Sequence, residues 1–400
     1  MCKSIRLLIH FAFMGGTYFM YTILVVDDTL FNRKLMLEVL ETKIDNARYL
    51  QAEDGIEAIE IVKTNEVDLV ILDLMMPNKN GYEVLKELKN NPLYSDIPII
   101  VNSSVTDMDS IKQTLEMGAV DYFTKPLTPE QMEVIIPLKV NNTLKYHEQN
   151  RQLKMVSRNI NNEMKMAGAF QKALMSMYED KLYPGLDLYV YFKACEHLSG
   201  DFFELVETGG NRWFIIADIK GHGAAAAMMS FMVRKMFNNI IRQESQPKDV
   251  LEKINKAYHE LKIDTELVFF SAFIGKINGN ELTYSNAGHP HPALLSLDIN
   301  KGRRLDCNGH FIGFMDDTTY TEETVVLEDE DCILLHTDGL YQGKQTPSVN
   351  LNRALANMIY SYSKNPSVKD LTCTVYGEYI MPDEELQDDI TIVALKYKNK

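Results

Sequence analysis

Several polar residues in the first third of the chain stand directly after short apolar runs, where the polar side chains of an α/β sheet gather. They are Asp27, Asp28, Asp73, Ser103 and Lys125. Carboxylates that meet at one sheet edge repel one another, so we expect a hard divalent cation such as Mg²⁺ between Asp27, Asp28 and Asp73. One carboxylate could then accept a phosphoryl group, with its charge neutralised by the metal and by Lys125. Taken singly, each residue is also consistent with a loop position or a helix N-cap.

The elements that must position this set alternate between apolar strands and helices. The apolar runs of TILVVDD, DLVILDLMMP, IPIIVNSS and DYFTKP are separated by helical patterns over Phe31 to Leu40, Tyr82 to Lys89 and Asp109 to Met117. Near-continuous apolar strands separated by helices indicate a parallel sheet that is covered on both faces. We therefore predict a doubly wound α/β domain with a parallel five-stranded sheet over residues 21–140.

The same segments resemble response-regulator receiver domains. VVDD, LDLMMPNKNGYEVL, the position of Ser103 and DYFTKP occur in that family's order and spacing. The resemblance implies that Asp73 is the phosphoacceptor, that the aspartates hold Mg²⁺, and that Lys125 contacts the phosphoryl group. Ser103 and Tyr122 would be the switch pair, and a histidine kinase or a phosphotransfer protein would be the phosphoryl donor. VNSS departs slightly from the family's usual pattern at the switch position.

Carboxylates stand at the ends of apolar runs in the second half of the chain as well. They are Asp201 after HLSG, Asp218 in FIIADIKGHG, Asp338 in LLHTDG, and the pair Asp388 and Asp389 before ITIVALKY. Such oxygen ligands suit two Mn²⁺ or Mg²⁺ ions, which lie about 3.5–4 Å apart in two-metal sites. A single Asp-Gly is more often a turn. Its recurrence at several strand ends favours a metal cluster.

The elements around these carboxylates are strands in pairs, and INGNELTY carries an Asn-Gly hairpin signal. Helical patterns run from Ala224 to Arg242, from Pro247 to Leu261 and again after Asn352. Antiparallel strand pairs mixed with long helices indicate an α+β fold. We predict a β-sandwich flanked by helices over residues 183–400.

This region resembles the metal-dependent PPM (type 2C) serine/threonine phosphatases, in their bacterial sporulation and stress-response branch. SGDFFEL, IADIKGHGAAAAMM, LTYSNAGHPHPALL, LLHTDGL and QDDITIVAL follow that family's order. The resemblance implies a catalytic centre in which Asp218 bridges two ions and the carbonyl of Ile219 ligates one of them. The remaining implied ligands are Asp201, Asp338 and Asp388, with Asp389 as the alternative to Asp388. An activated water would attack a phosphoserine or phosphothreonine in line.

Two departures from the family pattern concern the loops around the site. SGD replaces the usual Gly-Gly-Asp before Asp201, and His222 stands in IKGHG where the bacterial branch often has lysine. His222 could donate the leaving-group proton, although a loop histidine is the simpler interpretation. We expect NAGHP, residues 286–290, to shape a loop and His289 not to be a metal ligand.

The connector, residues 141–182, is mostly polar and rich in helix formers. A 3-4-3-4-3-4 spacing runs through Leu153, Val156, Ile160, Glu163, Ala167, Phe170 and Leu174. A coiled-coil homodimer is one interpretation of this seam. The other is a single amphipathic helix that packs against its own domains.

Bulk properties narrow the remaining choices. The chain has 400 residues and a formal net charge of −15, which argues against direct nucleic-acid binding. Its five cysteines are scattered, as in a cytoplasmic protein with reduced thiols. Residues 1–20 are expected to be a disordered or non-native extension, and a membrane-associating segment is the alternative.

These features together predict a two-component response regulator that is an enzyme. Its output would be dephosphorylation of a partner protein, by resemblance a phosphorylated anti-sigma-factor antagonist, under the control of Asp73. The alternative is a phosphorylation-switched binding adaptor with a non-catalytic phosphatase-like domain. No expected carboxylate is missing, which favours the enzyme.

Overall fold

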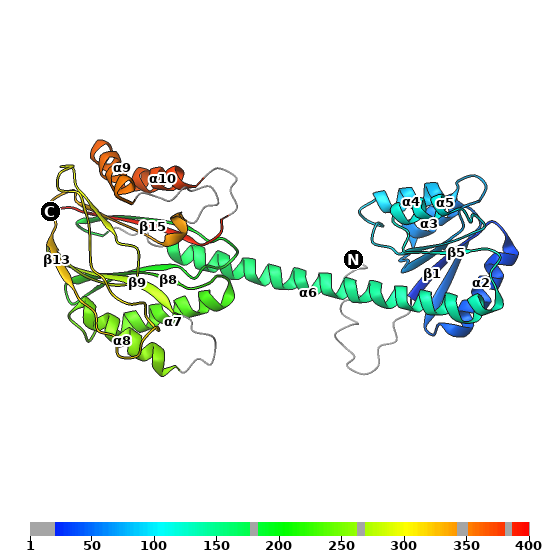
Figure 1. The fold of residues 1–400 in the computed structure, drawn as a ribbon, viewed down its shortest axis with the longest axis horizontal. Helices are drawn as coiled ribbons and strands as arrows, with labels where there is room; N and C mark the ends of the chain where they lie inside the picture. The colour runs from blue at the N-terminus through cyan, green and yellow to red at the C-terminus, as the bar shows by residue number, and fades with distance from the viewer. Residues whose placement is uncertain (1–20, 177–182, 262–268, 342–350, 381–385, 400) are drawn as a thin grey trace. The chain divides into compact units, whose positions relative to one another are not determined.

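The computed structural model describes residues 21–176, 183–261, 269–341, 351–380 and 386–399 (Figure 1). The predicted N-terminal extension lies outside these residues. The chain divides into two compact units, Met1–Arg158 and Asn159–Lys400, and each is described by itself. Within the described ranges, no helix combines the length and the apolar character that crossing a membrane requires.

The first unit contains the predicted five-stranded parallel sheet, in the order β2-β1-β3-β4-β5. Its strands are β1 (Tyr21–Val26), β2 (Ala47–Ala52), β3 (Leu69–Leu72), β4 (Ile99–Ser103) and β5 (Asp121–Thr124). The central strands β3 and β4 are buried along their whole length, which explains their continuous apolar sequences. The carboxyl ends of β1, β3, β4 and β5 bring the predicted polar residues to one edge.

Helices cover both faces of this sheet (Figure 1). They are α2 (Leu30–Lys43), α3 (Gly55–Thr64), α4 (Gly81–Asn90) and α5 (Met108–Glu116). Along β1, Ile23 and Val25 belong to the core with α2, whereas Leu24 and Val26 belong to the core with α3 and α4. This alternation follows from the two-residue period of a strand.

One long helix, α6 (Ile136–Ser176), follows a short π-helical stretch, η1 (Gln131–Ile135). Its first turns bury Ile136, Val140 and Leu144 in the core of the first unit. The predicted heptad seam, in contrast, is largely exposed. Its exposed fractions are 66% for Leu153, 55% for Val156, 51% for Ile160 and 66% for Phe170. Ala167 and Leu174, which belong to the same seam, are half-buried.

The second unit is a sandwich of two five-stranded antiparallel sheets, as predicted. One sheet has the order β13-β10-β9-β8-β7 and the other β12-β11-β14-β15-β6. The first contains β7 (Phe202–Thr208), β8 (Asn211–Ile219), β9 (Phe270–Asn278), β10 (Glu281–Ala287) and β13 (Glu323–Val326). The second contains β6 (Leu186–Lys193), β11 (Ala293–Leu295), β12 (Arg303–Arg304), β14 (Cys332–His336) and β15 (Ile390–Tyr397).

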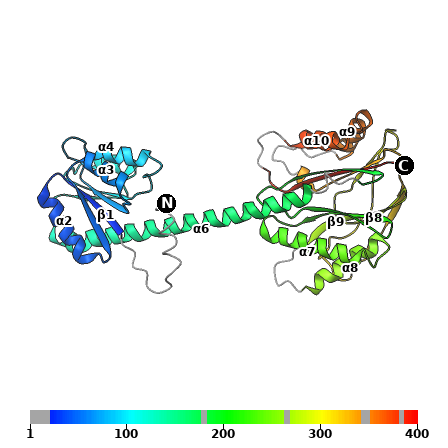
Figure 2. The same ribbon diagram turned by 180° about the vertical axis from the view of Figure 1, so that it is seen from behind.

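Two helices flank each side of this sandwich, and both views agree on the arrangement (Figures 1 and 2). They are α7 (Ala224–Ile240) and α8 (Pro247–Glu260) on one side, with α9 (Leu351–Lys364) and α10 (Val368–Tyr379) on the other. In β15, Val393 and Leu395 join the core that contains β8 and β9, whereas Ile392 and Ala394 pack with α9 and α10. The single-turn helix η2 (Asp338–Tyr341) follows β14.

Candidate functional site

The first acidic site lies at the carboxyl edge of the parallel sheet. Asp27 and Asp28 follow β1, Asp73 follows β3, and each offers a carboxylate oxygen within 4.8 Å of the other two. Among the residues that the structure describes, this is the one group of three or more acidic, His or Cys side chains that comes so close together. Three carboxylate oxygens at this spacing fit a hard cation such as Mg²⁺.

Lys125, which follows β5, provides this site with a positive charge of its own. Its Nζ lies 2.6 Å from Asp27 Oδ2 and 2.5 Å from Asp73 Oδ2. Burial alone would lower the pKa of Lys125, but the hydrogen bonds to the two carboxylates raise it above its ordinary value. The structure therefore brings together the three aspartates and the lysine that the sequence analysis selected.

Neighbouring residues fix the orientation of Asp27. Its Oδ1 accepts hydrogen bonds from the backbone N–H of Thr29 at 2.9 Å and from Asn32 Nδ2 at 3.1 Å. Arg33 donates to the carbonyl oxygen of Asp27 at 2.7 Å. Asn32 and Arg33 were not among the predicted site residues. Both follow Asp27 closely in the chain, and both face it from the first turn of α2.

Gly81 explains how the loop after Asp73 closes. A Cβ at this position would lie 2.2 Å from the carbonyl oxygen of Asp73, so a larger residue would push that backbone away. Gly81 N donates to the carbonyl oxygen of Leu74 at 2.9 Å, and Met75 N donates to Asp73 Oδ1 at 3.1 Å. The Asn-Gly of the sequence thus serves a close backbone approach beside the predicted phosphoacceptor.

The predicted switch residues lie on adjacent strands, and both contact Val105. Ser103 is fully buried at the end of β4, and its Oγ accepts from Val105 N at 3.5 Å. The hydroxyl of Tyr122, on β5, donates to the carbonyl oxygen of Val105 at 2.7 Å. The loop after β4 is therefore held by the two side chains that the sequence analysis paired.

The second acidic site lies in the second unit, around Asp218 near the end of β8. Burial, the charges of Asp201 and Asp338, and a hydrogen bond shared with Asp338 raise the pKa of Asp218 to about 10. Burial also raises the pKa of Asp388, and the charge of Asp338 adds to this rise. The predicted carboxylates thus share one electrostatic environment, in which their ionised forms repel one another.

Two threonine hydroxyls bind Asp201, which is 1% exposed. Thr337 Oγ1 and Thr391 Oγ1 donate to Asp201 Oδ2 at 2.7 Å and 2.9 Å. Burial and the charge of Asp389 raise the pKa of Asp201 well above its usual range, and the two hydroxyls partly oppose this. The sequence analysis missed both threonines, although each lies within two residues of a selected aspartate, in HTDG and DDIT.

The adjacent residues Asp388 and Asp389 have different surroundings. Both oxygens of the buried Asp389 accept from backbone amides, Oδ1 from Cys195 N at 2.8 Å and Oδ2 from Gly200 N at 2.9 Å. Asp388 is half-buried, and its Oδ1 accepts from the backbone N–H of Asp389 at 2.9 Å. Asp389 therefore holds the loop between β6 and β7, and Asp388 has the more accessible carboxylate.

Two glycines allow the loops of this site to meet. A Cβ on Gly200 would lie 2.7 Å from the carbonyl oxygen of Ile219, the backbone oxygen predicted to bind a metal. A Cβ on Gly339 would lie 2.0 Å from the carbonyl oxygen of Asp389. The serine of SGD is accommodated as well, because Ser199 Oγ accepts from Asp201 N at 3.0 Å.

His222 lies on the exposed loop after β8. Its Nδ1 is 3.4 Å from Glu196 Oε1, and both side chains are more than half exposed. Its positive charge would lower the pKa of Asp388, which places it electrostatically close to the acidic site. No three carboxylates of this second site, all of which the structure describes, offer oxygens within 4.8 Å of one another. The second site is therefore more open than the first.

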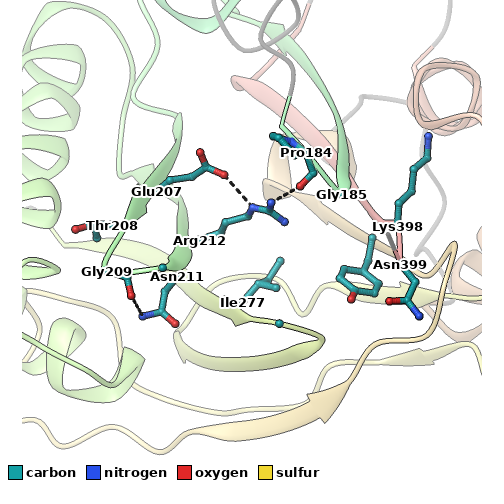
Figure 3. A pocket seen from close by; sticks show the side chains of 13 residues that line it. Pro184, Gly185, Glu207, Thr208, Gly209, Asn211, Arg212, Ile277, Lys398 and Asn399 are labelled. Atoms are coloured by element: carbon teal, nitrogen blue, oxygen red, sulfur yellow. Dashed lines mark hydrogen bonds and ion pairs between the residues drawn. The ribbon is translucent and has the colours of Figure 1, made fainter.

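A pocket of about 560 Å³ lies elsewhere in the second unit (Figure 3). The turn between β7 and β8 lines it, and Arg212 donates there to Glu207 and to the carbonyl oxygen of Pro184. None of the described residues that line it is a predicted site carboxylate. Its position therefore separates it from the acidic site around Asp218.

Comparison with known families follows the same division of the chain. Residues 23–136 match the response regulator receiver domain, and residues 208–398 match stage II sporulation protein E (SpoIIE). The chain carries a receiver domain and a SpoIIE-type phosphatase domain. Both predicted resemblances are thereby confirmed.

Individual relatives match different lengths of the chain. The chain is 24% identical over 280 residues to the phosphoserine phosphatase RsbU of Bacillus subtilis, a match that covers 68% of this chain and 82% of RsbU. The receiver domain is 40% identical over 116 residues to the probable transcriptional regulator ycf27 of Porphyridium aerugineum, which is 28% of this chain and 45% of that protein. The chain spans about half the length of the ycf27 relatives that it matches.

A solved structure supports the fold of the SpoIIE-type domain. The SiaA-PP2C domain of Pseudomonas aeruginosa superposes with a TM-score of 0.52 at 19% identity. The alignment covers 61% of this chain and 99% of that chain. The likeness shows that the second unit has a PP2C-type fold.

Proposed function

We propose that this chain is a response regulator whose output is the metal-dependent dephosphorylation of phosphoserine or phosphothreonine on a partner protein. One observation carries the proposal: loops from distant parts of the SpoIIE-type domain surround Asp218 with carboxylates. Gly200 and Gly339 leave the space that these loops need. Every carboxylate of the predicted set is present. A binding adaptor would tolerate the replacement of some of them.

In this proposal, the carboxylates of the second site hold two Mn²⁺ or Mg²⁺ ions. Asp218 would bridge them, the carbonyl oxygen of Ile219 would bind one, and Asp201, Asp338 and Asp388 would complete the set. Burial, and after it the charges of Asp201 and Asp338, raise the pKa of Asp218; the charges of these neighbours support the proposal, because carboxylates that repel one another bind divalent cations readily. When bound, such ions activate a water and neutralise phosphoryl charge.

The chain's own residues would do the remaining work at this site. Asp389 orients the loop that carries Asp201, through its bonds to Cys195 N and Gly200 N. Thr337 and Thr391 both donate to Oδ2 of Asp201 and thereby fix that carboxylate. The serine oxygen of the substrate leaves with a proton, and exposed His222 is the candidate donor.

The receiver domain would control this output through Asp73. Lys125 would exchange one of its carboxylate contacts for the phosphoryl oxygens, and Mg²⁺ would be held by Asp27, Asp28 and Asp73. Ser103 and Tyr122 would then release Val105, because the new charge competes for the Ser103 hydroxyl. A histidine kinase or a phosphotransfer protein would supply the phosphoryl group.

The substrate is proposed from the relatives. RsbU is by name a phosphoserine phosphatase, and its match spans 280 residues and 82% of RsbU. We therefore propose a phosphorylated anti-sigma-factor antagonist-like protein as the substrate of this chain. Phosphoproteomic comparison of cells with and without the protein would identify it, and an unchanged phosphorylation state of every such antagonist would exclude this class.

A second copy of the chain is the proposed partner of α6. The exposed seam of Leu153, Val156, Ile160 and Phe170 supports this, since apolar residues at heptad spacing on a helix surface are typical of coiled coils. Ile160→Lys is expected to convert a dimer into a monomer, as measured by light scattering after size exclusion. Lys165→Ala, an exposed position outside the seam, is the matched control. If the wild type is a monomer at a protein concentration of about 100 μM, where a dimer with a dissociation constant below roughly that value would be populated, the proposal is contradicted.

The phosphatase activity itself is tested with the full chain, a phosphoserine peptide and Mn²⁺. Asp218→Asn is expected to lower turnover by about a thousand-fold or more, because it removes the bridging ligand. Asp73→Asn should keep basal turnover and lose any response to acetyl phosphate. If the wild type releases no phosphate with or without acetyl phosphate, the proposed phosphatase activity is contradicted.

A further inference from the structure

An exposed aromatic surface adjoins the second acidic site, and the proposed catalysis gives it no role. It consists of Phe269, Phe311 and Phe314, together with Met315 and Lys220, and is called the aromatic platform below. Phe311 is 39% exposed, Phe314 55% and Met315 50%. The Phe269 ring lies 5.2 Å from that of Phe311 and 6.4 Å from that of Phe314 between centroids.

The backbone connects this platform directly to the candidate metal ligand Ile219. Ile219 pairs with Phe270 across β8 and β9, and Lys220 N donates to the carbonyl oxygen of Phe269 at 3.3 Å. Phe270 and Ile312 exchange two hydrogen bonds of 3.0 Å. Since paired strands lie about 4.8 Å apart, the backbone of Phe311 and Ile312 runs about 10 Å from that of Ile219.

Buried polar contacts hold the platform in place. Asn255, 1% exposed on α8, donates to the carbonyl oxygens of Met315 and Asp316 at 2.8 Å and 2.9 Å and accepts from Gly313 N at 2.9 Å. These three bonds fix the loop on both sides of Phe314. A loop that is pinned from below while its apolar side chains remain exposed is preorganised for binding.

The NAGHP motif makes room for the same surface. Gly288 has a φ of +70°, and a Cβ there would lie 2.8 Å from Phe311 Cδ1. Asn286 and His289 close this turn with two hydrogen bonds, Asn286 Nδ2 to His289 O at 2.9 Å and His289 N to Asn286 Oδ1 at 2.7 Å. The motif, which we expected to shape a loop near the site, thus provides the seat of the Phe311 ring.

Lys220 adds a positive charge to the platform. Its Nζ lies 4.5 Å from the centroid of the Phe269 ring, and it directly follows Ile219 in the chain. Such a cation–π contact positions the ammonium group without neutralising its charge. The surface therefore combines an apolar area with a cation that complements a phosphoryl group.

We propose that the aromatic platform binds the phosphoprotein substrate through an apolar side chain about three residues from the phosphoserine. This inference rests on the proposed function, because the substrate reaches the platform only if its phosphoserine enters the site around Asp218. Three residues of extended chain span about 10 Å, which is the distance between the two backbone segments. Phe314 would then be a specificity-determining residue.

Synthetic phosphoserine peptides test this with the full chain, Mn²⁺ and acetyl phosphate. The peptides differ in one residue, Leu or Asn, placed three positions before or after the phosphoserine. For the wild type we expect kcat/KM to be about ten-fold higher for a Leu peptide than for the matching Asn peptide, mainly because KM is lower. Partial burial of one leucine side chain provides a free energy of this size. Phe314→Ala should remove this preference, so that kcat/KM for the Leu peptide falls to that of the Asn peptide.

Two variants control for indirect effects. Phe314→Leu keeps an apolar surface and should retain most of the preference. Tyr360→Ala removes an exposed aromatic residue of α9 and should change neither peptide's turnover.

Each other outcome has a distinct meaning. Equal turnover of the Leu and Asn peptides by wild type overturns the platform proposal alone. Absence of turnover of every peptide overturns the proposed function and this inference with it. If Phe314→Ala changes the molecular mass in solution, the platform is a contact between copies of the chain, and the proposal is wrong.

Discussion

The two acidic sites of this molecule gather carboxylates in similar ways but neutralise them differently. In the receiver domain, Lys125 lies between Asp27 and Asp73 and forms an ion pair with each. In the SpoIIE-type domain, no lysine or arginine among the described residues forms an ion pair with Asp201, Asp218, Asp338 or Asp388. The first site thus contains a counter-charge supplied by the protein, and the second site has none among the described residues.

The hydrogen bonds of the two sites show the same difference. Asp73 receives an ammonium group, and Asp201 receives only two neutral hydroxyls. Burial and the charge of Asp389 raise the pKa of Asp201, and the two hydroxyl donors oppose this only in part. The two sites therefore differ in whether the protein itself supplies the positive charge next to the carboxylates.

A change in side-chain size alone should disrupt the second site. Gly339→Val would place a Cβ 2.0 Å from the carbonyl oxygen of Asp389 and separate the loops of Asp338 and Asp388. A shift of about 1 Å in a catalytic group can cost about 100-fold, so we expect at least that loss in phosphoserine peptide turnover.

Two other glycines provide matched controls for this change. Gly377→Ala, where a Cβ meets no heavy atom within 4 Å, should leave turnover intact. Gly81→Val disturbs the receiver site instead and should abolish the response to acetyl phosphate while basal turnover persists. If Gly339→Val keeps full activity, the contact between these loops does not shape the site.

A smaller effect is expected when the first site is made to resemble the second. Lys125→Met leaves two buried carboxylates without their cation, which should destabilise the receiver domain by about 3 kcal/mol in the absence of divalent ions. Millimolar Mg²⁺ should restore most of this stability, because the ion then replaces the lysine. Hydrogen exchange of the β1 and β3 amides, with and without Mg²⁺, measures it within the full chain.

The control for this variant is Lys139→Met, which breaks a half-exposed ion pair with Asp121. It should change stability by less than about 1 kcal/mol and show no dependence on Mg²⁺. Equal protection of β1 in the Lys125→Met variant and the wild type without Mg²⁺ would show that the lysine is not the counter-charge of this site.

Strong local patterns made much of the fold predictable. The buried strands β3 and β4 are continuous apolar runs, and the antiparallel pair β9–β10 carries an Asn-Gly hairpin signal. The edge strand β2, ARYLQA, was not singled out, because only Ala52 at its end is buried and the rest has no apolar run. The carboxylates were predictable for a similar reason, since each ends or begins a strand.

The partners of these carboxylates were not predictable from local sequence. Thr337 and Thr391 lie 136 and 190 residues from Asp201, so no periodicity links them. The difference between Asp388 and Asp389 likewise depends on backbone amides far along the chain. The sequence alone left both Asp388 and Asp389 as candidate ligands. The contacts in the structure distinguish them, because Asp389 holds a loop and Asp388 has the more accessible carboxylate.

The bonds of Asp389 also bear on how the chain acquires its activity during synthesis. Asp389 follows its partners Cys195 and Gly200 by 194 and 189 residues. Contacts of such sequence separation form late, because a long loop must close before they can be made. A nascent chain in which β15 has not yet left the ribosome therefore has no anchored Asp201 loop. The growing protein would be unable to remove phosphate until nearly all of the SpoIIE-type domain had been made.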